Sequence, residues 1–447
     1  MNHYKFSLHD YHAIKDTEIN LDGITVLSGI NGCGKSTLSR WLYYTVNGIA
    51  HYEDSTFSHY RRILHKWVSS YRFAFTDIEH YINSTNNTNI DIINRLHTME
   101  RQLLPYGYVS PEQINEMRAK CMDVIFFVKE ILMDEQIHQM PHPRLNRILR
   151  FLKIESDGSD YQGSIADYID KQMRYINRLA NQLYDELKTR PADNFFANIE
   201  VDYNIEEDTP EDIQLEEDGV RVFEGEHIST LLGLNKAIYI DTPMSITADV
   251  SDNPFWTALQ QLLLTEKKNV SPTSRLLLQR IKMLLHGEAV LTKDEVLDER
   301  TLRFVSSDRA INIDLSQAAT GYKTLVYLQR LLEIGCLDDK TLLLIDEPEA
   351  HLHPQWIVEF AHLLVLLHKE LGIKIMLASH NPDMVAAIQA VAAKEGVRNV
   401  THFYVAEPVA DHSHQYVYRD LGFEIEDIFE SFNIAIERIE AYGAIDI

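Results

Sequence analysis

GINGCGKS, residues 29–36, is the stretch that decides the fold of this 447-residue chain. It fits the pattern G-x-x-x-x-G-K-[ST]. The apolar run ITVLS at residues 24–28 precedes it and predicts a buried strand, and TLSRWLYY at residues 37–44 predicts a helix. A strand, a glycine-rich loop and a helix in this order are the setting that a phosphate-binding loop requires.

The residue types of this loop are those that hold a triphosphate. Glycines adopt backbone dihedrals closed to other residues, so that successive amide groups and the helix N-terminus face the negative charge. Lys35 is placed to reach the β- and γ-phosphates, and the Ser36 hydroxyl to hold Mg²⁺. The sequence therefore predicts a site for ATP and Mg²⁺ made by Gly29, Asn31, Gly32, Cys33, Gly34, Lys35, Ser36 and Thr37.

The second half of the predicted site comes three hundred residues later. Residues 342–347, LLLIDE, are four apolar residues followed by two acids, which predicts a strand covered on both faces. Its acidic end would lie where ligands bind in open α/β sheets. We expect Asp346 to hold Mg²⁺ together with Ser36, and Glu347 to polarise the attacking water as a general base.

A further strand is predicted at residues 373–378, IKIMLA, and Ser379 and His380 follow it. A histidine at this strand end could contact the γ-phosphate and sense its loss, so we count His380 with Lys35 and Glu347 as a catalytic candidate. In isolation, the same histidine would be interpreted as an ordinary strand-end residue. Its position after the acidic strand favours the catalytic interpretation.

Four segments in this order resemble the ABC-type ATPase heads of the SMC, RecF and OLD-like group. They are GINGCGKST, LSQAATGYKTL, LLLIDEPEAHLHP and LASHNPDMV, starting at residues 29, 315, 342 and 377. The DEPEAHLHP segment is similar to prokaryotic AAA-family proteins found in phage-defence operons. The resemblance implies an α/β fold: an ABC-type P-loop NTPase head with a mainly parallel sheet flanked by helices, an antiparallel β portion and a helical insertion.

On this resemblance, residues 315–323 stand where ABC proteins carry the signature loop, which contacts the γ-phosphate bound to a second subunit. Gly321 matches the family pattern, but Ala319 stands where the usual serine would be. Thr320 or Ser316 could replace that hydroxyl, or backbone amides alone could contact the phosphate. No clear Q-loop is present. Asp241 or Thr242 could do its work, or residues 237–243 could be a plain strand-to-loop junction.

The motifs, together with the resemblance, imply that the chain has three parts. Residues 1–50 are the N-terminal part of the ATPase head, residues 51–197 a helical insertion, and residues 198–447 the remainder of the head. Within the insertion, residues 169–187 carry apolar side chains at spacings of four and three, which favours a helix-packing seam over a long coiled-coil arm. Residues 164–167 resemble a capping box that opens this helix.

Two charged segments lie on either side of the second boundary. Residues 200–218 hold ten acids and no lysine or arginine, which indicates a solvated hairpin loop between strand-like residues 198–203 and 219–223. Residues 144–153 alternate basic and apolar side chains. That pattern indicates either a solvated amphipathic helix or a helix that contacts nucleic acid. Residues 254–286 are expected to be helical again, and a final helix is expected over residues 425–441.

Composition limits the classes of function. The formal net charge is −25, so phosphate repulsion argues against general nucleic-acid binding, although local basic surface could still bind DNA. No run of about 20 apolar residues predicts a membrane span, and the N-terminus lacks a secretory signal. Three cysteines without a C-x-x-C pair indicate reduced thiols in a cytoplasmic protein.

These observations predict an ATPase, converting ATP and water to ADP and phosphate, that acts as a nucleotide-driven dimerisation switch. Its expected partner is a second copy across the nucleotide sites, or a higher oligomer. Only 67 residues follow His380, too few for a fused Toprim nuclease, so the resemblance suggests anti-phage defence with a separately encoded nuclease or toxin. The alternatives are a DNA-repair or recombination ATPase that binds DNA directly, and an ATP-stabilised scaffold with little turnover.

Overall fold

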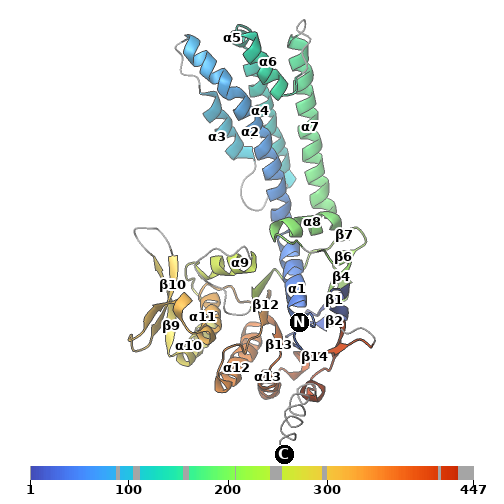
Figure 1. Cartoon of the computed structure of the whole chain (residues 1–447), viewed down its shortest axis with the longest axis vertical. Coiled ribbons are helices and arrows are strands. Elements are labelled where there is room, and N and C mark those ends of the chain that lie inside the picture. The colour runs from blue at the N-terminus through green and yellow to red at the C-terminus, as the bar shows by residue number, and fades with distance from the viewer. Residues whose placement is uncertain are drawn as a thin grey trace, which may run out of the picture. The chain divides into compact units, whose positions relative to one another are not determined.

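The computed structural model describes residues 2–86, 91–103, 111–154, 161–206, 208–241, 254–293, 300–410 and 414–430. The chain forms two compact units (Figure 1). The head comprises Met1–Ala50 and Ile199–Ile447, and the helical unit comprises His51–Asn198. Within the described part of the chain, no helix combines the length and the apolar character that a membrane crossing needs.

A ten-stranded sheet forms the centre of the head, in the order β5-β4-β1-β2-β15-β14-β3-β13-β12-β8. Its strands are β1 Tyr4–Tyr11, β2 Ile14–Asn20, β3 Ile24–Ser28, β4 Asp212–Glu217, β5 Val220–Arg221, β8 Lys236–Ile240, β12 Thr341–Asp346, β13 Lys374–Ser379, β14 Thr401–Pro408 and β15 Tyr416–Asp420. The neighbours from β14 to β8 are parallel, whereas β5, β4, β1 and β2 pair antiparallel, as do β14 and β15. The predicted fold class is confirmed.

Smaller elements complete the head. A three-stranded antiparallel sheet contains β9 Gly287–Lys293, β10 Arg300–Ser306 and β11 Asn312–Asp314, and a short ribbon contains β6 Phe223–Glu224 and β7 His227–Ile228. The helices are α1 Lys35–Ala50, α9 Pro254–Leu263, α10 Pro272–Leu285, α11 Thr320–Glu333, α12 Pro354–Leu371 and α13 Pro382–Glu395.

The two faces of the parallel strands carry different helices. Alternate side chains of a strand point to opposite faces. In β12, Leu343 and Ile345 join the core that α9 to α13 complete. Asp346 therefore points to the other face, where α1 contacts β8, β12 and β13. This alternation aims the predicted metal-binding carboxylate at the helix that follows the glycine-rich loop.

The helical unit is a bundle around one apolar cluster. Its helices are α2 Tyr52–Asn86, α3 Ile92–Leu103, α4 Pro111–Leu132, α5 Glu135–His138, α6 His142–Phe151 and α7 Tyr161–Thr189. In α7 the buried side chains Ile165, Ile169, Ile176, Leu179, Ala180 and Leu183 lie on one stripe. The helix α7 packs against α4, so the predicted seam is present.

Three local expectations were wrong or lie partly outside the described residues. Residues 198–203 are not a strand but part of α8, Ala192–Asp202, because the buried Phe195 and Ile199 are four residues apart, the period of a helix, while Val201 is exposed. The acidic run is therefore the end of α8, a connection and strand β4, and the hairpin turn comes only at residues 218–219.

The other corrections concern helix ends. Ser164 lies inside the first turn of α7, which already includes Tyr161, so it is not an N-cap. The segment 254–286 is mainly helical, as expected, and consists of α9 and α10; Ser271 caps the second by accepting a hydrogen bond from the backbone N–H of Ser274 at 3.0 Å. Of the final predicted helix, residues 426–430 are helical and residues 431–447 lie outside the described part.

Candidate functional site

Strand register brings the two halves of the predicted site to one edge of the sheet. The strand β13 lies between β3 and β12, and all three are parallel. Ser379 pairs with Ser28 in β3, and Ala378 pairs with Asp346 in β12. The residues that follow these strands therefore emerge side by side, although they are separated by three hundred positions in the sequence.

The glycine-rich loop joins β3 to α1 at this edge. Gly34 has a φ of 96°, and a Cβ at this position would lie 2.8 Å from Cγ1 of Ile14, so both backbone conformation and space require glycine. Ile30, Asn31 and Gly32 are exposed. Cys33 differs: its side chain is buried, and its carbonyl accepts a hydrogen bond from the Tyr418 hydroxyl at 3.1 Å, which leaves only its backbone N–H for a ligand.

The first turn of α1 carries the next three candidates, Lys35, Ser36 and Thr37. The Lys35 ammonium donates to the carbonyl oxygens of Gly29 and Ile30, at 2.8 and 2.9 Å. The side chain is thus folded over its own loop, where its charge is satisfied by backbone dipoles. A phosphate entering the loop would offer this ammonium a negatively charged acceptor in place of neutral ones, which adds Coulomb attraction to the hydrogen bond.

Asp346 is almost fully buried and is held by three hydroxyl groups. Its Oδ1 accepts a hydrogen bond from Ser39 at 2.7 Å, and its Oδ2 accepts one from Tyr239 at 2.8 Å. Ser36 also donates to this carboxylate. Burial raises the pKa of Asp346, and the hydrogen bonds from these hydroxyls oppose the rise. Asp241, which follows β8, raises the pKa further by charge repulsion.

This donor set fits Mg²⁺. The ion prefers oxygen ligands and keeps several waters, so one carboxylate and one hydroxyl from the protein are sufficient. Asp346 and the exposed Ser36 supply these two oxygens at the base of the loop. The open loop with its positive-φ glycines fits a phosphate chain in the same way.

Glu347 follows Asp346 and is directed away from the interior. Its φ is 48°, a left-handed conformation that is uncommon for a residue with a side chain. Its backbone N–H donates to the Ala378 carbonyl at 2.8 Å, which extends the pairing of β12 with β13 by one residue. The carboxylate is 39% exposed, as a group that meets a water molecule must be.

His380 lies between two carboxylates. Its Nδ1 is 3.8 Å from Oε1 of Glu347 and 3.5 Å from Oε1 of Glu349, and its side chain is 45% exposed. The following residue, Asn381, caps α13 by accepting hydrogen bonds from the backbone N–H groups of Asp383 and Met384. The N-cap of α13 is therefore supplied by Asn381 and not by His380.

Glu349 is the least expected member of the site. Its side chain is only 4% exposed, and its Oε1 accepts hydrogen bonds from the Ser379 hydroxyl at 2.9 Å and the His380 N–H at 3.1 Å. Its Oε2 is buried with no hydrogen-bond partner among the described residues. Burial raises the pKa of Glu349, which its hydrogen bonds partly oppose.

The signature-like loop lies elsewhere in the head. Thr320 begins α11, and Gly321 packs against the segment that follows Glu349: a Cβ there would lie 2.9 Å from the carbonyl oxygen of His351. In Figure 1, α11 lies beside β9 and β10 and apart from α1. The structure thus brings Lys35, Ser36 and Thr37 to the same edge as Asp346, Glu347 and His380, and it does not gather Thr320 and Gly321 with them.

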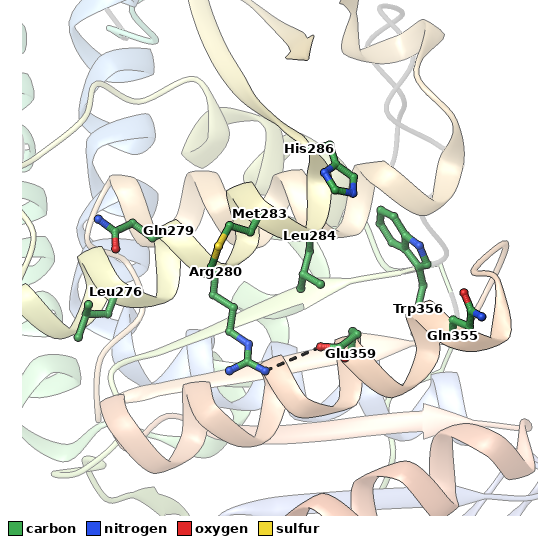
Figure 2. A pocket seen from close by; sticks show the side chains of 9 residues that line it. All are labelled: Leu276, Gln279, Arg280, Met283, Leu284, His286, Gln355, Trp356 and Glu359. Atoms are coloured by element: carbon green, nitrogen blue, oxygen red, sulfur yellow. Dashed lines mark ion pairs between the residues drawn. The ribbon is translucent and has the colours of Figure 1, made fainter. Parts of the chain in front are cut away.

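A groove next to α11 is lined by none of the residues at this edge (Figure 2). It has a volume of about 880 Å³ and lies between α10 and α12. Arg280 and Glu359 form an ion pair across it at 3.8 Å, and Trp356 on its wall packs edge-to-face against Tyr322 at 5.3 Å between ring centres. The residues that line it are Leu276, Gln279, Arg280, Met283, Leu284, His286, Gln355, Trp356 and Glu359, none of which is a predicted nucleotide ligand.

Sequence reasoning missed Ser39, Tyr239 and Glu349. Ser39 is four residues after Lys35, so it lies one helical turn further along the same face and could have been found. The position of Tyr239 depends on the pairing of β8 with β12, which no local pattern encodes. Glu349 is visible as the third acid of DEPE, residues 346–349, but only the turn after Glu347 shows that it points inward. Of the two Q-loop candidates, Asp241 lies near Asp346 and Thr242 lies outside the described residues.

Comparison with known proteins gave one family match. A family model described as "AAA domain, putative AbiEii toxin, Type IV TA system" matches residues 143–386, more than half of the chain. The matched region contains Gly321, Asp346, Glu347 and His380, and it begins after the glycine-rich loop. No curated protein matches the chain.

Among solved structures, the chain is similar to head domains of SMC proteins. One is the SMC head domain from Thermotoga maritima, with 11% identity, a TM-score of 0.36, and coverage of 94% of this chain and 99% of that chain. Another is the Smc head domain with an extended coiled coil from Pyrococcus furiosus, bound to the C-terminal domain of ScpA. It has 12% identity, a TM-score of 0.33, and coverage of 98% of this chain and 100% of that chain.

Proposed function

Because the chain belongs to the AAA-domain family described as putative AbiEii toxin of a Type IV TA system, we propose that it binds and hydrolyses ATP and that nucleotide controls its dimerisation. Family membership confirms the resemblance to ABC/SMC-like AAA P-loop ATPases that the sequence motifs indicated. The finer proposal concerns what this particular chain does with the nucleotide.

The observation that carries the proposal is the meeting of two distant segments at one sheet edge. The first turn of α1 supplies Lys35 and Ser36, and the ends of β12 and β13 supply Asp346, Glu347 and His380. The hydrogen bonds from Ser36 and Ser39 to Asp346 join the two segments directly. Phosphate-binding, metal-binding and proton-accepting groups therefore share one small region.

Each group has a distinct role in the proposed hydrolysis. Lys35 exchanges its backbone carbonyl partners for the β- and γ-phosphates and so neutralises their charge. Asp346 and Ser36 would hold Mg²⁺, which would supply positive charge to neutralise the charge that develops on the phosphates. Glu347, exposed and ionisable, orients and deprotonates the attacking water. His380 contacts the γ-phosphate and responds to its loss.

The position of α11 supports a dimer. Residues 315–323 resemble a signature loop, and α11 lies apart from α1 within the head (Figure 1). A second copy that presents this loop to the exposed glycine-rich loop would complete the site on both chains. Nucleotide bound between the two heads would stabilise only the closed state, which is the differential affinity that a switch requires.

The partner remains part of the proposal. The family description names a toxin of a Type IV TA system, which supports a role beside a separately encoded protein. On this basis we propose that ATP-driven closure controls an effector nuclease or toxin in anti-phage defence. A fold hosts many functions, so this step rests on analogy with the family.

Glu347→Gln tests the proposal. The substitution keeps the size of the side chain and removes the base, so ATP turnover should fall by about 100- to 10,000-fold while ATP binding is retained. Because the nucleotide is no longer consumed, the variant should accumulate as a dimer with ATP and Mg²⁺, measured by light scattering after size-exclusion chromatography. Wild-type protein should dimerise only transiently.

Two results would contradict parts of the proposal. A wild-type protein that binds ATP but shows no turnover above that of Glu347→Gln would indicate a scaffold. If Glu347→Gln loses turnover but forms no nucleotide-dependent dimer, the proposed ATPase activity would stand and the proposed dimerisation switch would be rejected. Lys35→Ala serves as the control that should lose both binding and dimerisation.

Direct DNA binding is the second candidate, and one observation favours it. Arg144, Arg147 and Arg150 are exposed on α6, whose opposite face buries Leu145 and Ile148. Arg147 already forms an ion pair with Asp77, which reduces the positive charge of this face. Salt-dependent DNA binding that is lost in the double variant Arg147→Glu, Arg150→Glu would favour this role. Equal binding by both proteins would reject this face as the DNA site.

A further inference from the structure

The turn after Glu347 directs two neighbouring acids to opposite environments. The backbone N–H of Ala350 donates to the carbonyl of Glu347 at 2.9 Å, and that of Leu352 donates to the carbonyl of Glu349 at 3.0 Å. These turns leave Glu347 39% exposed while the Glu349 side chain is 4% exposed beneath the end of β13. A buried carboxylate costs free energy unless it is hydrogen-bonded, so its placement there requires an explanation.

The surroundings of Glu349 point to His380. One of its oxygens, Oε1, receives the Ser379 hydroxyl and the His380 N–H, and it lies 3.5 Å from His380 Nδ1. The other oxygen, Oε2, has no hydrogen-bond partner among the described residues. The carboxylate thus binds the backbone N–H of His380 through Oε1, and the same oxygen lies close to Nδ1 of the ring.

We propose that Glu349 is a positioning residue that holds the His380 imidazole with Nδ1 facing inward and Nε2 facing the nucleotide. This inference rests on the proposed function, because His380 is the group that would contact the γ-phosphate. A carboxylate beside Nδ1 requires a proton on that nitrogen, and it thereby fixes the tautomer and the direction in which Nε2 points. The 3.5 Å separation shortens to a hydrogen bond when nucleotide engages Nε2, as catalytic hydrogen bonds commonly do on substrate binding.

Glu347 does not perform this task equally well. It lies 3.8 Å from the same Nδ1, but its exposed carboxylate has to meet water and so cannot also be fixed to the ring. The buried Glu349 is fixed by Ser379, and Ser379 is itself fixed because its hydroxyl accepts a hydrogen bond from the Asn381 N–H at 3.1 Å. The site thus contains one acid for the water molecule and one for the histidine.

The proposal is tested by measuring kcat and KM for ATP in four variants and comparing them with the wild-type protein. We expect Glu349→Gln to lower kcat by about 10- to 100-fold, the usual loss when a supporting partner of a functional group is removed, with KM for ATP nearly unchanged. His380→Ala should lower kcat at least as much. Because Glu349 acts through His380, the double variant should be no slower than His380→Ala alone.

Glu395→Gln is the matched control. Glu395 also pairs with a histidine of the head, His362 at 3.4 Å, but on α12 and α13 rather than at the sheet edge. This variant should keep wild-type kcat. Multiplicative losses in the double variant Glu349→Gln, His380→Ala, with each substitution reducing kcat by its own factor, would overturn the positioning role and indicate a general structural one.

A spectroscopic measurement tests the same inference without turnover, so that its failure is distinct from failure of the ATPase proposal. In ¹⁵N-histidine-labelled protein, the His380 resonances are identified by their loss in His380→Gln. We expect Nδ1 of His380 to carry a proton in the wild-type chain, and the Nε2–H tautomer to become populated in Glu349→Ala. An identical tautomer in both proteins would overturn the inference whether or not the chain hydrolyses ATP.

Discussion

The head and the helical unit are built from different interiors. Of the 21 described polar or charged residues that are buried, 20 lie in the head and one, Thr56, lies in the helical unit. The head has only about twice as many residues, so size does not explain the difference. Apolar packing dominates the bundle, in which the nearly buried Glu100 pairs with Arg72 and His65, whereas the head buries more charged groups that must each find partners. The comparison indicates that most of the buried polar groups that depend on exact positions lie in the head.

The largest effect should come from breaking a buried ion pair of the head. Arg330 of α11 is fully buried and donates to Glu333 at 2.7 Å and to the Leu263 carbonyl. We expect Glu333→Ala to lower the free energy of unfolding by about 3–5 kcal/mol, because it leaves the guanidinium charge buried without its counter-ion. Urea denaturation measures the loss.

The double variant Arg330→Met, Glu333→Leu separates charge from packing. Replacing a buried pair by apolar residues of similar volume is often neutral, so stability should recover toward the wild-type value. A double variant as unstable as Glu333→Ala would show that packing, not the buried charge, causes the loss.

The next effect concerns the apolar bundle. Leu183 of α7 is fully buried in its cluster, so Leu183→Ala should lower the free energy of unfolding of the helical unit by about 3 kcal/mol through lost burial and a residual cavity. Urea denaturation followed by helix-sensitive circular dichroism measures it. Leu183→Met keeps most of the volume and should cost less than about 1.5 kcal/mol. Equal losses in the two variants would argue against a tightly packed seam.

Removing the Tyr239 hydroxyl, which donates a hydrogen bond to the predicted metal ligand Asp346, should lower the free energy of unfolding by less. Tyr239→Phe deletes the hydrogen bond to Oδ2 of Asp346 and should cost about 1.5 kcal/mol, typical for a bond to a charged group. Asp346 must be ionised to hold Mg²⁺, and this hydroxyl helps to lower its pKa. The affinity for Mg²⁺ and ATP should therefore fall on acidification, and in Tyr239→Phe this fall should begin at higher pH.

Titration calorimetry of ATP and Mg²⁺ between pH 5 and 8 measures the shift. Tyr43→Phe is a control on the neighbouring helix, since burial also raises the pKa of this tyrosine, to about 12, and no role in the site is proposed for it. If Tyr239→Phe leaves the pH dependence where it is in the wild-type protein, the hydroxyl does not tune Asp346.

The same contrast explains what the sequence could predict. Apolar residues at alternating spacings of four and three predicted the α7 seam, because an apolar interior needs only the right spacing. The glycine-rich loop and the acids after β12 were predictable because their chemistry is local. Tyr239 and Glu349 were not, since the first depends on the pairing of Ile240 with Ile345 and the second on a turn with two left-handed residues. The strand expected at residues 198–203 was wrong because apolar and polar residues alternate there by chance, although most of the segment is the last part of α8.

The smallest change in the free energy of unfolding should come from breaking an exposed ion pair on the bundle, as the counterpart of the buried pair of Arg330 and Glu333. Arg174 and Asp170 on α7 form an ion pair at 2.7 Å, the same distance as between Arg330 and Glu333, but their side chains are 70% and 64% exposed. Water already solvates both charges, so Asp170→Ala should change the free energy of unfolding by no more than about 0.5 kcal/mol. Urea denaturation in low and high salt measures it. A loss close to that of Glu333→Ala would mean that distance rather than burial sets the strength of these pairs, and the proposed difference between the two interiors would fail.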